Sequence, residues 1–418
     1  MNTNKKTPKL RFKGFTDDWE QRKLGEIFEY LQNNTLSRDS LNYKIPNIKN
    51  IHYGDILVKF NEILDGSNKD IPYINPDLDL SKFSKSLLRD GDVIFSDTAE
   101  DDTVGKAIEL QNVNAPFILS GLHTIPCRPL IPFGKGYLGN FFNSNSYRLQ
   151  IRPLVQGIKV SSISKSALKD TMIKYPKNLD EQEKIGSLFQ SITKMITLHQ
   201  RKLEKLKLNK SALLQRIFPQ NGCTVPEVRF KGFTEDWEQR KFSDLYEKIS
   251  EKNDLSYTLD KIISVANMYY KSDAKVSNEE YLKTYNIFRY GEIAFEGNKS
   301  KAFTYGRFVE NTIGDGIVSH VFEVFRPVNK YDIYFWKYYI NYEPIMGKIL
   351  SRCTKKTTMM TNLVVKDFLN ETILVPDLTE QKQIGALLNT LDKYITLHQY
   401  KLNSLMSIKK ALLQQLFV

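Results

Sequence analysis

Hydrophobic residues recur every seven positions in two segments of this chain, within residues 179–218 and 378–418. A seven-residue repeat held over about five heptads predicts two long helices, each with a supercoiled seam. At ~1.5 Å per residue, each helix would be roughly 60 Å long. We expect the two helices to cover each other's seams, in antiparallel orientation. The seam positions are Ile185, Phe189, Ile192, Ile196, His199, Leu203, Leu206, Lys210, Leu213 and Ile217 in the first segment, and Ile384, Leu388, Leu391, Ile395, His398, Leu402, Leu405, Lys409, Leu412 and Leu416 in the second.

Both helices are expected to begin shortly after a proline, Pro176 or Pro376. Acidic residues follow each proline, as is typical of a first helical turn. Thr379 is the predicted N-cap of the second helix, because a threonine hydroxyl can accept a hydrogen bond from an unpaired N–H group.

Outside the two long helices, several short stretches are rich in β-branched residues and bounded by Gly, Pro, Asn or Asp, which is typical of strands. Strands are predicted at 45–56, 92–95, 117–119, 262–265, 291–295 and 318–325, and helices at 137–149 and 331–349. The predicted class is α+β, with two pseudo-twofold-related mixed α/β domains separated by the two long helices, which pack as an antiparallel coiled coil.

An internal repeat supports this organisation. Residues 8–23 and 226–241 are identical at 13 of 16 positions, and residues 179–218 and 378–417 at 21 of 40. The segments between the copied blocks differ, so the repeat predicts a shared frame that carries two divergent inserts. The predicted divisions are a first domain at 1–178, the first helix at 179–218, a linker at 219–226, a second domain at 227–377 and the second helix at 378–418.

Composition narrows the class of partner. The 418 residues include 60 Lys and Arg against 48 Asp and Glu, so the formal net charge is +12. This excess favours nucleic acid as the partner, with an acidic protein surface as the second candidate. Three cysteines, odd in number and far apart, predict neither a disulfide framework nor a zinc site. No apolar run approaches a membrane span and the N-terminus does not look like a secretory signal, so we expect a cytoplasmic protein without membrane contact.

Motifs that carry catalytic chemistry are weak here. Residues 134–139 fit the pattern G-x-G-x-x-G, but a poor strand precedes them and no suitable acidic residue follows. Residues 376–382 imitate a nuclease PD…ExK set, but the set is compressed into a loop and one helical turn. We therefore expect no catalytic residue, no metal site and no cofactor in this chain. A duplicated frame without a copied catalytic set favours a recognition function.

Polar, basic and aromatic loops in the two inserts are the candidates for that recognition. Lys and Arg neutralise phosphates, whereas Asn, Ser, Thr, Arg and His side chains can reach base edges. Alignment on Pro176 and Pro376 places residues 157–164 over 357–364. The candidate DNA-binding residues are Lys44, Lys49, His52, Tyr53, Asn68, Lys69, Lys159, Ser161, Ser162 and Lys165 in the first domain, and Asn267, Tyr269, Lys271, Asn298, Lys299, Lys301, Arg352, Lys355, Lys356, Thr357 and Thr358 in the second.

The whole chain resembles the DNA-specificity (S) subunit of Type I restriction–modification systems. The order of copied and divergent blocks carries the resemblance, together with Gly-Asp-Val at 91–93 and two sets of motif residues. These are Arg11, Phe12, Phe15, Trp19, Leu24, Pro176, Glu181, Gln182 and Ile185, and their counterparts Arg229, Phe230, Phe233, Trp237, Pro376, Glu380, Gln381 and Ile384, with Phe242 in place of Leu24.

The resemblance implies two target recognition domains, each reading one half of a bipartite asymmetric site in double-stranded DNA. It implies that the helices space the domains and dock two methyltransferase (M) subunits, with restriction (R) subunits added for cleavage. It implies that the chain is not itself an enzyme. S-adenosylmethionine would bind the M subunits, and ATP with Mg²⁺ would be used by the R subunits.

Three alternatives remain open from the sequence. The chain could be a stand-alone bilobed nucleic-acid-binding regulator, an enzyme such as a nuclease with an unrecognised site, or a scaffold for protein partners alone. Co-purification with a methyltransferase separates the first from the specificity subunit. Incubation of the chain with DNA and magnesium tests the second, and salt-dependent duplex binding tests the third.

Overall fold

The computed structural model describes residues 7–114, 116–220, 222–271, 278–357 and 360–418. The chain forms two compact units: unit 1 consists of Met1–Arg201 and Gln399–Val418, and unit 2 of Lys202–His398. The chain passes from unit to unit near the middle of each predicted long helix. Each unit therefore holds the beginning of one long helix and the end of the other.

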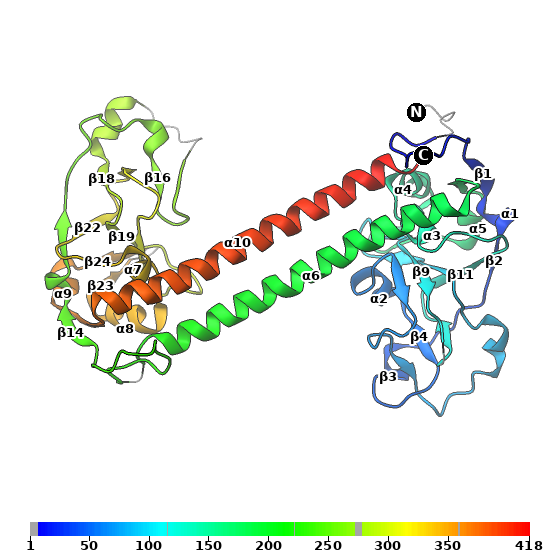
Figure 1. Ribbon diagram of the computed structural model, residues 1–418, viewed down its shortest axis with the longest axis horizontal. Helices are drawn as coiled ribbons and strands as arrows, with labels where there is room; N and C mark the ends of the chain where they lie inside the picture. The colour runs from blue at the N-terminus through cyan, green and yellow to red at the C-terminus, as the bar shows by residue number, and fades with distance from the viewer. Residues whose placement is uncertain (1–6, 115, 221, 272–277, 358–359) are drawn as a thin grey trace. The chain divides into compact units, whose positions relative to one another are not determined.

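The long helices are α6 (Leu179–Ile217) and α10 (Leu378–Gln415), drawn in green and red in Figure 1. In unit 1, the ring of Phe189 in α6 stacks on Phe417, just beyond the end of α10, with centroids 5.8 Å apart. In unit 2, Lys210 near the end of α6 donates to Asp392 of α10 at 2.5 Å. Within each unit the two helices thus run in opposite directions, and every predicted seam position is buried or half-buried.

Each long helix begins at a polar cap that follows the predicted proline. The Asn178 side chain accepts from the main-chain N–H of Asp180 at 2.8 Å. The Asp377 carboxylate accepts from the N–H groups of Thr379 and Glu380 at 2.7 and 3.0 Å. The prediction of Thr379 as the cap is therefore wrong: Asp377 immediately precedes α10, whereas Thr379 lies within its first turn. The negative charge of Asp377 also suits the positive end of the helix dipole.

Two sheets form the body of unit 1. The five-stranded sheet has the order β2-β11-β7-β9-β5, with β2 Phe28–Tyr30, β5 Ile63–Asp65, β7 Val93–Ser96, β9 Ala107–Gln111 and β11 Thr124–Pro129. The four-stranded sheet has the order β10-β4-β6-β3, with β3 Leu41–Asn42, β4 Lys49–Ile51, β6 Tyr73–Ile74 and β10 Ile118–Ser120. Two short pairs join β1 Glu20–Lys23 to β13 Met172–Tyr175 and β8 Thr98–Ala99 to β12 Ser161–Ser162.

Short helices close the core of unit 1. They are α1 Leu24–Ile27, α2 Tyr53–Val58, α3 Tyr137–Phe142, α4 Asn145–Ile151 and α5 Lys165–Lys169. Rings from α3 and α4 meet Phe95 of the large sheet, with Phe142 centred 4.8 Å from both Phe95 and Tyr147. Phe189 and Phe417 of the long-helix segments lie in the same cluster. The core of unit 1 therefore needs the C-terminal end of the chain.

Unit 2 repeats this plan with a smaller sheet. Its four-stranded sheet has the order β15-β22-β19-β20, with β15 Tyr246–Ile249, β19 Ile293–Glu296, β20 Arg307–Glu310 and β22 Glu323–Pro327. The strand pairs are β14 Glu238–Lys241 with β25 Thr372–Val375, β16 Ile263–Ser264 with β17 Tyr269–Tyr270, β18 Asn286–Phe288 with β21 Gly316–Val318, and β23 Thr354–Lys356 with β24 Thr361–Leu363. The shorter helices are α7 Ile333–Tyr339, α8 Glu343–Cys353 and α9 Val365–Asn370.

The copied sequence blocks build the same frame in both units. The Gln182 amide donates to the Pro176 carbonyl at 2.7 Å and accepts from the Gly134 N–H at 2.8 Å. In unit 2, Gln381 makes the equivalent bonds to Pro376 and Asp332, at 3.0 and 3.1 Å. These bonds fix the start of each long helix against its own unit, which explains why the Glu-Gln pair occurs in both copies.

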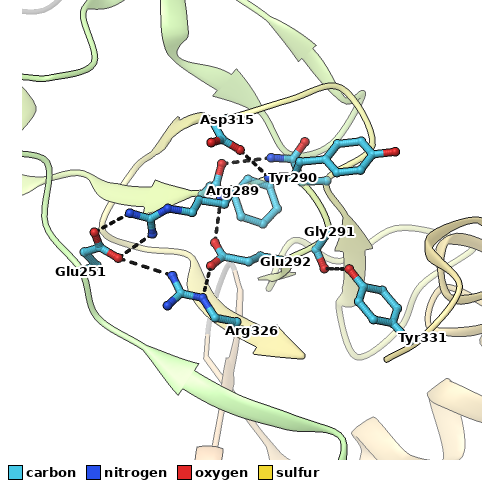
Figure 2. Close-up of polar contacts among 10 residues, drawn as sticks. Glu251, Arg289, Tyr290, Gly291, Glu292, Asp315, Arg326 and Tyr331 are labelled. Carbon is cyan, nitrogen blue, oxygen red and sulfur yellow. Dashed lines mark hydrogen bonds and ion pairs between the residues drawn. The ribbon is translucent and has the colours of Figure 1, made fainter. Parts of the chain in front are cut away.

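The two units also share a tight turn that an arginine side chain stabilises. In unit 2, Glu292 accepts from the Arg289 N–H at 2.7 Å and from the Arg326 guanidinium at 2.7 Å (Figure 2). In unit 1, Asp92 accepts in the same way from the Arg89 N–H and from Arg128, both at 2.9 Å. The glycine of each turn, at 91 or 291, has a positive φ near +85°, a conformation that glycine adopts at little cost.

The α+β class is confirmed, but some predicted elements have different boundaries. Residues 45–56 form strand β4 and then the start of α2, because His52 caps a helix there. Residues 318–325 are the end of one strand and the start of another. The two aromatic segments each form two helices instead of one. Ile217 and Phe218, at the end of α6, belong to the core of unit 2.

Candidate nucleic-acid interface

Four segments of unit 1 meet at one surface, which we name loop cluster 1: residues 52–53, 97–99, 121–124 and 156–162. The Tyr53 N–H donates to the Leu122 carbonyl at 3.3 Å, and the Asp97 N–H donates to the His123 carbonyl at 3.1 Å. Strand β8 pairs with β12, which sets Thr98 opposite Ser162. The sequence candidates His52, Tyr53, Lys159, Ser161 and Ser162 therefore lie in one cluster.

Within loop cluster 1, His52 has a structural role. Its Nδ1 accepts from the Gly54 N–H at 3.2 Å and so caps α2. Burial, together with the nearby Arg38 charge, lowers the pKa of His52 to about 4. The His52 ring is therefore neutral near pH 7, and its centroid lies 4.7 Å from that of Tyr53. Lys159, in contrast, is exposed to solvent on its loop.

The other candidates of unit 1 lie outside this cluster. Lys49 is only 3% exposed, and its ammonium group donates to the carbonyls of Gly66 and Asn68 at 2.7 and 3.1 Å. Burial also lowers the pKa of Lys49. Lys44 and Lys69 are exposed on separate loops, and Lys165 opens α5. Lys49 and Asn68 thus hold a turn together, whereas the remaining lysines face solvent.

Most candidates of unit 2 also lie together at one surface, which we name loop cluster 2. It consists of residues 266–271, 296–307 and the described part of 354–361. The Lys299 ammonium donates to the Thr357 carbonyl at 3.0 Å, and Asn298 forms a β-bridge with Met360. Arg307 donates to the Ala266 carbonyl at 2.8 Å and to Glu296 at 2.8 Å. The exposed candidates here are Asn267, Tyr269, Lys271, Asn298, Lys299, Lys301, Lys355, Lys356 and Thr357.

Two candidates of unit 2 stand apart. Arg352 forms a bidentate contact with the Glu371 carboxylate, with its Nε 2.8 Å from Oε1. Its charge is therefore already paired within the unit. Thr358 lies outside the described residues.

The two loop clusters occupy equivalent places in the repeated frame. The Ile163 N–H donates to the Asp97 carbonyl at 2.8 Å, and the Thr361 N–H donates to the Gly297 carbonyl at 2.9 Å. Each bond ties the late loop of its unit to the chain just after β7 or β19. The backbone frame is thus shared, while the side chains displayed on it differ between the units.

Sequence reasoning missed several residues of these clusters. In unit 1 it missed Asp97, Thr98 and His123, which have no sequence pattern of their own. In unit 2 it missed Tyr305 and Arg307: the Lys356 ammonium lies 5.5 Å from the Tyr305 ring centroid, and Arg307 lies 4.9 Å from that of Phe303. The resemblance of Tyr305-Gly306-Arg307 to Val104-Gly105-Lys106 was the available signal for the second pair.

The motifs considered for catalysis are engaged in structural contacts. The N–H groups of Gly136 and Gly139 donate to the buried Glu109 carboxylate at 2.6 and 2.9 Å. Glu380 and Asp377 bind Arg229 and the start of α10. Across the described ranges, no group of His, Cys, Asp and Glu side chains could hold a metal ion. Among the same residues, no helix has the length and apolarity to span a membrane.

Apolar side chains are also exposed at equivalent positions of the two long helices. Met195 and Leu198 project to solvent in α6, and Tyr394 and Leu397 do so in α10. In the internal repeat, 195 corresponds to 394 and 198 to 397. Exposed apolar side chains therefore recur at the same two positions of both copies.

Comparisons with known proteins agree with this architecture. A family model described as the Type I restriction modification DNA specificity domain matches residues 16–208 and 234–407. The type I restriction enzyme MjaX specificity subunit of Methanocaldococcus jannaschii is 24% identical over 233 residues, 53% of this chain and 51% of that protein. The chain thus spans about half the length of this curated relative.

Two solved structures are similar over nearly the whole chain. The Type I restriction–modification S subunit from M. genitalium has a TM-score of 0.59 at 13% identity, covering 99% of both chains. The HsdS subunit from Thermoanaerobacter tengcongensis has a TM-score of 0.45 at 17% identity, covering 96% of both chains. The first of these shows that the two chains share a fold.

Proposed function

Since the chain belongs to the Type I restriction modification DNA specificity family, we propose that it recognises a bipartite site in double-stranded DNA, with each unit binding one half. The observation that carries this proposal is the presence of one loop cluster per unit at equivalent backbone positions. Because the side chains of the two clusters differ, the two half-sites should differ in sequence.

The chemistry of each cluster suits DNA. The exposed lysines of loop cluster 2, among them Lys299, Lys301 and Lys356, would neutralise phosphates and give salt-dependent affinity. Asn267 and Asn298 offer amide groups that can pair with adenine in the major groove. Loop cluster 1 carries fewer cations than loop cluster 2 and includes two histidine side chains, so it would bind a half-site of different sequence.

We further propose that the two exposed apolar pairs, Met195 with Leu198 and Tyr394 with Leu397, dock two copies of a methyltransferase subunit. A repeated patch fits a partner that binds twice, and its apolar side chains would be buried in the contact. S-adenosylmethionine would then bind the methyltransferase, and a restriction subunit would use ATP and Mg²⁺. This chain would need no cofactor of its own and would act in the cytoplasm beside the DNA.

The test exchanges residues 227–377 for the corresponding segment of another member of the family and maps methylated sites in cells. The expected result is a new sequence in one half of the site, with the other half unchanged. Changes in both halves, or in neither, would contradict the assignment of one half-site to each unit.

Docking is tested separately with the variants L198E and L397E. We expect both to reduce co-purification with the methyltransferase, because each places a charge in the apolar contact. The controls K207E and K401E alter exposed lysines of the same helices and should leave co-purification unchanged. Equal recovery of the partner with all four variants would refute this docking surface.

A further inference from the structure

We propose that His123 reads one base of the half-site bound by unit 1, by accepting a hydrogen bond at Nε2 from the exocyclic amino group of adenine or cytosine. This inference rests on the proposed function and names a specificity-determining residue that no sequence pattern indicates. It stands on the backbone, the hydrogen-bond partners and the exposure of this side chain.

The backbone of His123 is held in an unusual conformation. Its φ is +54°, in the left-handed region that residues other than glycine seldom adopt. Neighbouring bonds maintain it: the His123 carbonyl accepts from Asp97 at 3.1 Å, and the Gly121 N–H donates to Ile51 at 2.8 Å. Residues held in sparsely populated backbone regions often lie at functional sites, so this conformation supports a functional role for His123.

The imidazole is oriented through one of its nitrogens. Nδ1 lies 3.3 Å from the Asp97 carboxylate and 3.4 Å from the Thr98 hydroxyl. The Thr98 hydroxyl itself donates to Asp97 at 2.7 Å, which fixes the carboxylate. Since a carboxylate only accepts hydrogen bonds, the contact favours the tautomer with its hydrogen on Nδ1, and in this tautomer Nε2 presents its lone pair as an acceptor.

The side chain is also exposed enough to reach a ligand. It is 48% exposed, and its ring lies edge-on to Tyr53 with centroids 5.2 Å apart. His52, which the sequence favoured, differs in both respects, since it is buried and its Nδ1 is used by the cap of α2. His123 therefore combines a fixed acceptor, an exposed ring and a place among the polar loops of cluster 1.

An acceptor at this place discriminates between bases. In the major groove, adenine presents its N6 amino group and cytosine its N4 amino group as donors, whereas guanine O6 and thymine O4 are acceptors. An Nε2 lone pair facing O6 or O4 would leave two acceptors opposed and desolvated. His123 should thus favour an amino-bearing base at one position and reject the other two.

The experiment maps methylated sites in a host strain whose chromosomal gene for this protein is replaced by one that encodes the H123A variant. Each mismatched base pair in a specific site usually costs about 1–3 kcal/mol, so we expect roughly tenfold weaker preference at one base position of one half-site. The other half-site and the gap should be unchanged. D97A should relax the same position, because Asp97 is the positioning residue for the ring, whereas the control H320A, an exposed histidine of unit 2, should change none.

The outcomes separate this inference from the proposed function. Wild-type cells without any bipartite methylated site would refute the proposed function itself. A wild-type bipartite site that keeps full selectivity in both H123A and D97A would refute only the assignment to His123. If H123A abolished methylation by failing to fold, D97A would still decide, because relaxation at a single position is not a consequence of general misfolding.

Discussion

Arg11 holds both carboxylate oxygens of Glu181, with Nε 2.7 Å from Oε1 and Nη2 2.9 Å from Oε2, across 170 residues of chain. Arg229 binds Glu380 in unit 2 with the same geometry, at 2.7 and 2.8 Å. The Glu181 side chain is only 1% exposed. The copied block at the start of each repeat is thus fastened to the first turn of that repeat's long helix, which explains why the arginine and the glutamate recur together.

Loss of the ion pair between Arg11 and Glu181 should strongly reduce the free energy of unfolding. R11A would leave the Glu181 carboxylate buried without its partner, and removal of one member of a buried ion pair typically costs about 3–5 kcal/mol. Chemical unfolding of the full chain measures the change in the free energy of unfolding. R22A is the control, because Arg22 pairs with Glu20 at the surface, where solvent screens the ion pair and its loss should change stability far less. Equal effects of the two variants would contradict the buried role of Arg11.

Glu310 predicts a pH-dependent contribution to stability. This residue of β20 is 2% exposed, and none of the described residues hydrogen-bonds to its carboxylate. The nearby Tyr331 hydroxyl donates instead to the Gly291 carbonyl at 2.6 Å (Figure 2). Burial raises the pKa of Glu310 well above its ordinary value. The folded state therefore retains a proton that the unfolded chain releases above roughly pH 4.5.

Because the folded state binds more protons, the free energy of unfolding should fall as pH rises from the unfolded toward the folded pKa. E310Q removes this titration, so its stability relative to wild type should be higher at pH 8 than at pH 5. Urea unfolding at the two pH values gives the difference. E247Q, at an exposed position of β15, serves as the control. A constant difference between E310Q and wild type would show that Glu310 does not titrate differently on folding.

Substitution of two lysines of unit 1 should have different effects, one on DNA affinity and the other on stability. K159A removes an exposed charge of loop cluster 1, so duplex affinity should fall and the slope of log affinity against log salt should decrease by about 1. K49A instead leaves the carbonyls of Gly66 and Asn68 without their donor, which should cost about 1–3 kcal/mol of stability. Salt-dependent binding and chemical unfolding of both variants check this. A stable K49A variant with weakened DNA binding would reverse the assignment.

The long helices predict a change in spacing without a change in sequence preference. Removal of seven residues from the middle of both α6 and α10 preserves the heptad register and shortens each helix by roughly 10 Å. This length equals about three base pairs at ~3.4 Å each. Mapping of methylated sites should show a shorter gap between unchanged half-sites. An unchanged gap would refute the role of the helices in spacing.

The long helices and the repeated frame could be predicted from sequence patterns alone. Their signals are local or copied: heptads such as Ile185 and Ile192 define a helix without reference to the rest of the chain, and the matching blocks around Trp19 and Trp237 show the duplication directly. The cap of α10 was missed by two residues, since Asp377 and Thr379 are both suitable caps and only the backbone path selects between them.

The polar residues of the candidate interface, in contrast, could be identified only from contacts between distant parts of the chain. Lys49 and Lys159 look alike in sequence, but one is buried against two carbonyls and the other is exposed. His123 became a candidate only because pairing of distant segments sets it beside Asp97, 26 residues away. Strand register and loop contacts depend on long-range packing, which no local pattern encodes, so the sequence predicted the frame whereas the fold selected the side chains that it displays.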